Sequence, residues 1–184
     1  MSLRATLAAF TIAAGPALAQ EAGDVFIDAP NNAKAHAASG FVCPSSIGHF
    51  ERNAVGERDP QAGADFCAYS ALDGVYGMIT LLPLTGPYDP KTALVPDFQE
   101  QEATGGRKIA EAPMRLGGAN VYARTYRTTD LEDTHYRVLF AASAVGNWAV
   151  QVTMEYASPR DDAVEKEFLE LVYAQAFKKL ASRN

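Results

Sequence analysis

Apolar and polar residues alternate most regularly near the C-terminal end of the chain, where they predict a β-hairpin. Residues 134–145 and 148–156 are separated by Gly146-Asn147, a dipeptide typical of two-residue hairpin turns. In 148–156, apolar side chains hold every even position, and small or polar side chains hold the odd positions. This alternation indicates a strand with one face turned toward a core.

A second strand pattern, at 75–84, differs because both alternating sets of positions are apolar. Such a segment is typical of a central strand that is buried on both faces. Asp73-Gly74, just before it, is another hairpin signal. Shorter patterns predict further strands at 41–44, 47–55, 66–70, 108–116 and 120–127. Successive strands joined by short turns favour an antiparallel sheet.

Helix signals lie between the two groups of strands and at the C-terminal end. Asp89 is a helix cap, and Pro96 divides the segment after it into helices over 90–95 and 96–103. Residues 159–181 carry a broad apolar stripe, which predicts an amphipathic helix. We therefore predict an α+β fold: an antiparallel sheet of about six to seven strands with helices on both faces (an α/β/α sandwich), closed by the C-terminal helix.

The N-terminal end has the layout of a secretory signal peptide. A short basic start is followed by an alanine-rich apolar run and an Ala-x-Ala sequence. We expect cleavage between Ala19 and Gln20 to remove residues 1–19, which leaves a periplasmic or secreted protein without a membrane anchor. Residues 20–40 show no sustained pattern and are predicted to form a flexible N-terminal arm. Residues 41–184 are predicted to form a single domain.

Two cysteines, Cys43 and Cys67, lie in the predicted domain. An even number of cysteines in an exported protein favours a disulfide bond. In the chain-entropy treatment, closing a loop of this length stabilises the folded state by about 3.5 kcal/mol. The two thiols do not have the spacing of a zinc or redox motif, and no histidine has a ligand-like spacing. No metal and no other cofactor is therefore expected.

Charge and motif content narrow the classes of function. The chain has 16 Lys and Arg against 22 Asp and Glu, a net charge of −6, and no cluster of basic residues. This composition disfavours nucleic-acid binding and attachment to anionic lipid. The chain also lacks the short motifs of common hydrolases and nucleotide-binding proteins. A non-catalytic protein is favoured, and the alternative is a small extracytoplasmic hydrolase that uses His49 or His135.

Strand register combined with residue type predicts one candidate binding site. If a two-residue turn joins the last two strands, position 137 falls opposite 156. If residues 128–133 form the preceding connection, position 124 falls opposite 137. In this register six polar side chains gather in two neighbouring rows, with Arg124, Arg137 and Tyr156 in one and Tyr126, His135 and Ser158 in the other.

Two arginines directly opposite each other repel unless an anion or a carboxylate lies between them. The functional interpretation is a pocket for a small anion or carboxylate, with arginine forks and tyrosine hydroxyls as donors. The alternative is that a carboxylate from 96–103 or from the last helix pairs with the arginines. A register change of one residue would remove the row.

The connection 84–98 supplies a second candidate surface, because it combines several prolines with Tyr88 and Phe98. An exposed aromatic edge of this kind can bind a protein partner. The alternative is a loop whose aromatic side chains pack on the domain.

The order of elements over residues 41–181 resembles that of the Mog1/PsbP-like domains, α/β/α sandwiches often found in exported proteins. The resemblance rests on the opening segment 41–44, the helical insert 90–103, the strands that end at 148–156 and the closing amphipathic helix. It implies a binding or assembly role and assigns no functional residue. We therefore expect an exported, non-catalytic binding or accessory domain for a protein partner or a small anionic ligand.

Overall fold

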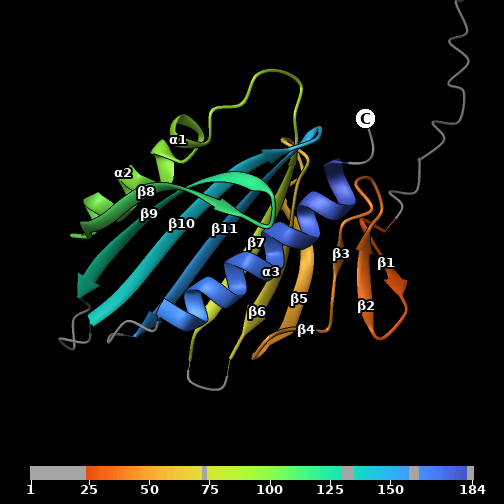
Figure 1. Ribbon diagram of the computed structural model, residues 1–184, viewed down its shortest axis with the longest axis horizontal. Helices are drawn as coiled ribbons and strands as arrows, with labels where there is room; N and C mark the ends of the chain where they lie inside the picture. The colour runs from red at the N-terminus through yellow and green to blue at the C-terminus, as the bar shows by residue number, and fades with distance from the viewer. Residues whose placement is uncertain (1–23, 72–73, 130–134, 158–161, 182–184) are drawn as a thin grey trace, which may run out of the picture.

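The computed structural model of this chain describes residues 24–71, 74–129, 135–157 and 162–181 (Figure 1). The predicted signal peptide, residues 1–19, and Ser158 of the predicted polar rows lie outside the described residues. The described residues form two antiparallel sheets and three helices. Among them, no helix combines the length and the apolar character that crossing a membrane requires.

The main sheet has eight strands, in which every neighbouring pair is antiparallel. It exceeds the predicted six to seven strands because it includes a two-residue edge strand, which is too short to leave an alternating pattern. From edge to edge the strands are β4 (Ser46–Ile47), β5 (Phe50–Asp59), β6 (Ala64–Ser70), β7 (Tyr76–Pro83), β11 (Trp148–Ala157), β10 (His135–Val145), β9 (Ala119–Thr129) and β8 (Arg107–Leu116).

One face of the main sheet is covered by the short helices α1 (Pro90–Ala93) and α2 (Val95–Ala103). The Asp89 carboxylate accepts hydrogen bonds from the first backbone N–H groups of α1, as its position in the sequence predicted. These helices bury a compact cluster against β9 and β10, made of Leu94, Phe98, Tyr126, Val138, Phe140 and Ala142.

The opposite face is crossed by the long helix α3 (Asp162–Leu180), which Figure 1 shows in front of the sheet. Its apolar stripe, which includes the fully buried Phe168 and Val172, belongs to the main core. The turn between β8 and β9 also lies against this helix: a Cβ atom at Gly117, where φ is +55°, would lie 2.1 Å from the backbone N of Ala174. With helices on both faces, the predicted α+β architecture is confirmed.

A small second sheet lies beside the main one and contains β1 (Phe26–Ala29), β2 (Ala33–His36) and β3 (Val42–Cys43). Two of its strands fall within residues 20–40, for which the sequence predicted a loose arm, so that interpretation is wrong for this part of the chain. The hairpin between β1 and β2 depends on Asn31 and Asn32, whose φ angles are +60° and +56°. Asparagine adopts this left-handed region more readily than most residues.

Three groups of contacts attach the small sheet to the rest of the molecule. The predicted disulfide joins Cys43 of β3 to Cys67 of β6. The Arg52 guanidinium donates to the backbone carbonyls of Cys43 at 2.5 Å and Asn32 at 2.6 Å. His36 of β2 contacts Asp65 of β6 at 2.8 Å. The N-terminal strands are therefore a covalently attached part of the fold.

Candidate functional site

Three arginines lie in one row across the end of the main sheet. In the register of the strands, Arg107 of β8 is opposite Arg127 of β9, which is opposite Arg137 of β10. Tyr156 of β11 is opposite Arg137 and extends the row. The Tyr156 hydroxyl donates to Glu165 of α3, so the row lies on the face that α3 crosses. Like charges directly opposite each other destabilise a sheet unless a negative group lies between them.

The inner end of this row is held by a buried tyrosine–glutamate pair. Tyr156 and Glu165 are each only 4 % exposed. Burial raises the pKa of the Tyr156 hydroxyl well above its usual range, and the Glu165 hydrogen bond acts in the same direction. The Arg137 guanidinium lies beside this hydroxyl and opposes the rise in its pKa. Within the described part of the chain, Nη1 of Arg137 is buried and has no hydrogen-bond partner.

The outer end of the row is open to solvent. Arg107 and Arg127 are exposed, and neither is joined to a carboxylate by an ion pair among the described residues. A polar hollow of about 470 Å³ lies at this end, lined by Thr104, Gly105, Arg107, Arg127, Thr128 and His135. Because it brings two arginines and a histidine together, its chemistry suits an anion.

Of the two strand pairings that placed Arg124 and Arg137 in one row, one is confirmed and the other is wrong. Position 137 does lie opposite Tyr156, but Arg124 lies opposite Phe140. Strand β9 extends to Thr129, which is opposite His135, so the connection begins later than predicted and the register differs by three residues. An odd difference moves every side chain to the other face. Arg124 and Tyr126 therefore face α2, whereas Arg137 and Tyr156 face α3.

Arg124 is neutralised on its own face, as the alternative interpretation anticipated. Its guanidinium lies 3.3 Å from Glu111 and 3.8 Å from Glu102 of α2, and it stacks 3.8 Å from the centre of the Phe98 ring. It also donates to the hydroxyls of Tyr126 at 3.0 Å and Tyr122 at 3.2 Å. Nε is buried without a partner among the described residues, but both Nη atoms are paired. This cluster attaches α2 to the sheet.

Both aromatic residues of the proposed partner loop are packed on the domain. Phe98 is 3 % exposed and contacts Tyr126 and Phe140. Tyr88 is half-buried, and its hydroxyl accepts a hydrogen bond from Gln151 at 3.2 Å. Burial raises the pKa of Tyr88. Neither side chain forms an exposed aromatic edge.

The histidines lie in three different environments. His49 is exposed and lies 3.8 Å from Glu167, and His135 lines the basic hollow. His36, which the sequence did not single out, contacts Ser39 at 2.6 Å and Asp65 at 2.8 Å. No spacing signal marks this Ser–His–Asp group, because Asp65 comes from a different sheet.

The Ser–His–Asp group lacks an accessible nucleophile. Ser39 and His36 are each 1 % exposed, and the Ser39 Oγ already accepts the backbone N–H of Phe41 at 3.0 Å. A catalytic serine must reach its substrate, so we interpret the group as a link between the two sheets. Among the described residues there is also no group of three or more potential metal ligands.

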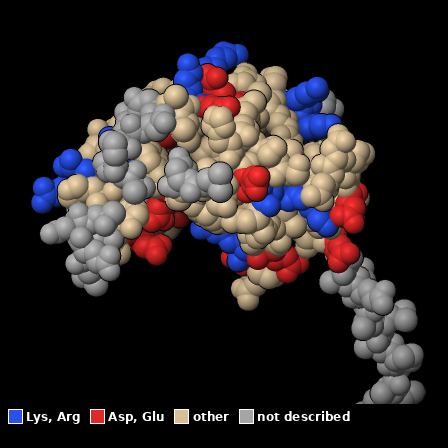
Figure 2. Space-filling model, turned by 90° about the horizontal axis from the view of Figure 1, so that it is seen from below, with Lys and Arg blue, Asp and Glu red and all other residues tan. Residues whose placement is uncertain are grey.

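No protein-family profile matches the chain, and a search of curated proteins found no match. On the face seen in Figure 2, Lys and Arg residues lie beside Asp and Glu residues, with broad uncharged areas between them. A local cluster of arginines is accordingly better suited to a small anion than to an extended polyanion.

Proposed function

We propose that this protein is an exported, non-catalytic binding domain, and that its ligand is a small oxyanion held by Arg107, Arg127 and Arg137. The observation that carries the proposal is the strand register, which aligns these three side chains on one face. An oxyanion between them would replace repulsion with charge-assisted hydrogen bonds.

The arginines differ in how firmly they are held, and this difference suits a binding site. Arg137 is positioned beside the buried Tyr156–Glu165 pair, whereas Arg107 and Arg127 are exposed. One donor is therefore fixed before a ligand arrives, and the other two can close on it. Fixing a donor in advance reduces the entropy lost on binding.

Export is part of the proposal because two features agree with it. The signal-peptide pattern at residues 1–19 is typical of secretion, and the Cys43–Cys67 disulfide is typical of an oxidising compartment. The hydrolase alternative gains no comparable support. His49 is exposed beside Glu167, and the hollow that His135 lines holds two arginines but, among the described residues, neither a serine nor a cysteine that could act as its nucleophile.

Titration calorimetry of the purified, oxidised protein with acetate and phosphate at low salt tests the proposal. We expect binding that weakens in Arg127→Ala and Arg137→Ala and falls as salt rises. Arg115→Ala is the matched control, because Arg115 is an exposed arginine on β8 that alternates to the other face of the strand. Anion binding that survives both substitutions in the row would overturn the proposal.

A further inference from the structure

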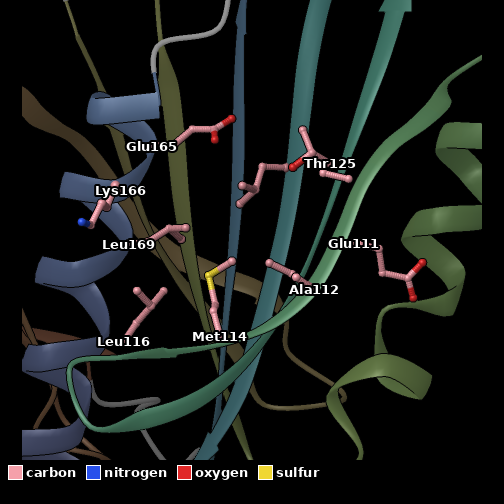
Figure 3. Close-up of a pocket in the computed structure, with 11 residues that line it drawn as sticks. Glu111, Ala112, Met114, Leu116, Thr125, Glu165, Lys166 and Leu169 are labelled. Atoms are coloured by element: carbon pink, nitrogen blue, oxygen red, sulfur yellow. The ribbon is translucent and has the colours of Figure 1, made fainter.

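A second hollow lies under α3, directly beside the arginine row. It has a volume of about 400 Å³, which falls in the usual range for small-molecule sites. Figure 3 shows α3 on one side of it and strand β8 on the other. Its lining residues are Ala110, Glu111, Ala112, Met114, Leu116, Ala123, Thr125, Leu139, Glu165, Lys166 and Leu169.

The hollow exists because the floor beneath the first turns of α3 is made of small side chains. Ala110 and Ala112 of β8 and Ala123 of β9 lie where larger residues would fill the space against Leu169 of the helix. Ala110 and Ala112 are exposed, so the hollow is open along the edge strand of the sheet. A ligand can therefore enter without disrupting the core.

The floor of the hollow leads to the arginines. From Leu116 to Ala110, six residue-to-residue steps of β8 span about 20 Å along the strand. Ala110 is paired with Thr125, and the next side chain of β9 on the same face is Arg127. The arginine row is thus the next row beyond the Thr125 end of the hollow.

The polar groups of the hollow are concentrated at that same end. In Figure 3, Glu165 on the helix side and Thr125 on the strand side lie toward one end of the hollow, and Leu116 lies toward the other. Figure 3 also shows the Glu111 carboxylate and the Lys166 amine pointing away from the hollow. The space between is lined by alanine, leucine and methionine side chains. The Glu165 carboxylate at this end already accepts the Tyr156 hydroxyl, and the arginine row begins just beyond Thr125. An apolar hollow that adjoins a row of arginines is complementary to an amphiphile with one anionic end.

We propose that the ligand is an amphiphilic monocarboxylate, with its carboxylate on the arginine row and its hydrocarbon chain in the hollow under α3. This inference rests on the proposed function and adds the chemical class of the ligand. A strand from another protein fits this edge less well, because Pro113 of β8 has no backbone N–H to donate and the pairing of β8 with β9 shifts register at Ile109.

Calorimetry with acetate, butyrate, hexanoate and octanoate tests the inference on the oxidised protein. Burying a methylene group gains roughly three- to fourfold in affinity per group. We therefore expect affinity to rise steadily with chain length, and we expect octanoate to bind roughly 10- to 100-fold more tightly than the neutral octanol, which lacks the charge. Octanol binding as tightly as octanoate would overturn the inference.

A hollow-filling variant separates the two proposals. Ala112→Phe places a ring in the hollow, and Ala110→Leu is a smaller substitution with the same purpose. Both substitutions should abolish the rise in affinity from acetate to octanoate and leave the affinity for acetate unchanged. Unchanged acetate binding would also show that the variants are correctly folded. Arg115→Phe is the control: it adds the same ring on the other face of the strand and should change neither the chain-length dependence nor the affinity for acetate.

These experiments test separately whether the hydrocarbon chain (the tail) binds in the hollow and whether the carboxylate binds to the arginine row. Octanoate that binds no more tightly than acetate, with both lost in Arg127→Ala, would overturn the amphiphile and retain the anion-binding function. Absence of binding by every carboxylate and by phosphate would overturn both. A chain-length effect that is unchanged in Ala112→Phe and Ala110→Leu would place the tail elsewhere and overturn the inference.

Discussion

Arg127 and Arg137 lie directly opposite each other on adjacent strands, and both face the side of the sheet that α3 crosses. A sheet gains nothing from such a pair, because two guanidinium groups at this spacing repel. This repulsion is the feature on which the proposed anion site rests. It also makes the ligand-free protein sensitive to salt.

In the ligand-free protein, Arg127→Gln should increase the free energy of unfolding at low salt by about 0.2–1 kcal/mol, because it removes a repulsive opposed pair. The gain should shrink at high ionic strength, where the charges are screened. Urea denaturation at two salt concentrations measures it, with Arg115→Gln as the control. A loss of stability at low salt would mean that Arg127 is paired with a carboxylate.

The Arg124 cluster predicts a specific response to acid. The hydrogen bond from Lys108, with further hydrogen bonds from Tyr122 and Arg124, holds the pKa of Glu111 well below its usual range. A lowered pKa in the folded state stabilises the protein above the ordinary carboxyl pKa of about 4.3, and this contribution is lost as pH falls toward the folded-state pKa.

Glu111→Gln should therefore be less stable than the unmodified protein by a constant amount above about pH 5, and this difference should shrink at lower pH. Urea midpoints measured from pH 7 to pH 2.5 check the prediction. Glu51→Gln on β5 is the control, because Glu51 is exposed and has no ion pair among the described residues. A difference that grows toward low pH would contradict the assignment.

The contact between His36 and Asp65, which links the two sheets, predicts that different substitutions at Asp65 lower the free energy of unfolding by different amounts. Nδ1 of His36 accepts the backbone N–H of Ser39 at 3.2 Å, so Nε2 carries the ring hydrogen that Asp65 accepts. Asp65→Ala leaves that buried N–H without a partner and should lower the free energy of unfolding by about 1–3 kcal/mol. Asp65→Asn keeps an acceptor and should cost less. Equal losses in the two variants would show that charge matters more than the hydrogen bond.

The turn between β8 and β9 predicts a difference between two glycines. Gly117 and Gly105 both have positive φ, but a Cβ at Gly117 would overlap the backbone of α3, whereas a Cβ at Gly105 would meet nothing within 4 Å. Gly105→Ala should cost about 1 kcal/mol from backbone strain alone. Gly117→Ala should cost a further 1–3 kcal/mol, roughly, from the overlap. Thermal unfolding of both variants measures the difference, and equal losses would contradict the contact.

The parts of the fold that could be predicted from the sequence are those with a local signal. The alternation before and after Gly146-Asn147 defined the last hairpin and its register, and Asp89 marked the start of α1. The connection before β10 has no such signal. Because its length was predicted wrongly, Arg124 was placed on the same face as Arg137.

Two other features depend on contacts between distant segments, which no local pattern shows. The small sheet is stabilised by Cys67, Arg52 and Asp65, all of which follow it in the chain. The third arginine of the row, Arg107, comes into register only after the irregular pairing of β8 near Ile109. Sequence reasoning that counted residues in regular steps could not place it there.

The order of strands in the main sheet has a consequence for how the protein folds. Strands β4 to β7 form one run of neighbours, β8 to β11 form another, and the two runs meet only where β7 pairs with β11. That seam joins residues as distant in sequence as Gly77 and Met154, so closing it requires the largest loss of chain entropy in the sheet. Each run can form from contacts between residues close in sequence, so we expect pairing of β7 with β11 to limit the folding rate.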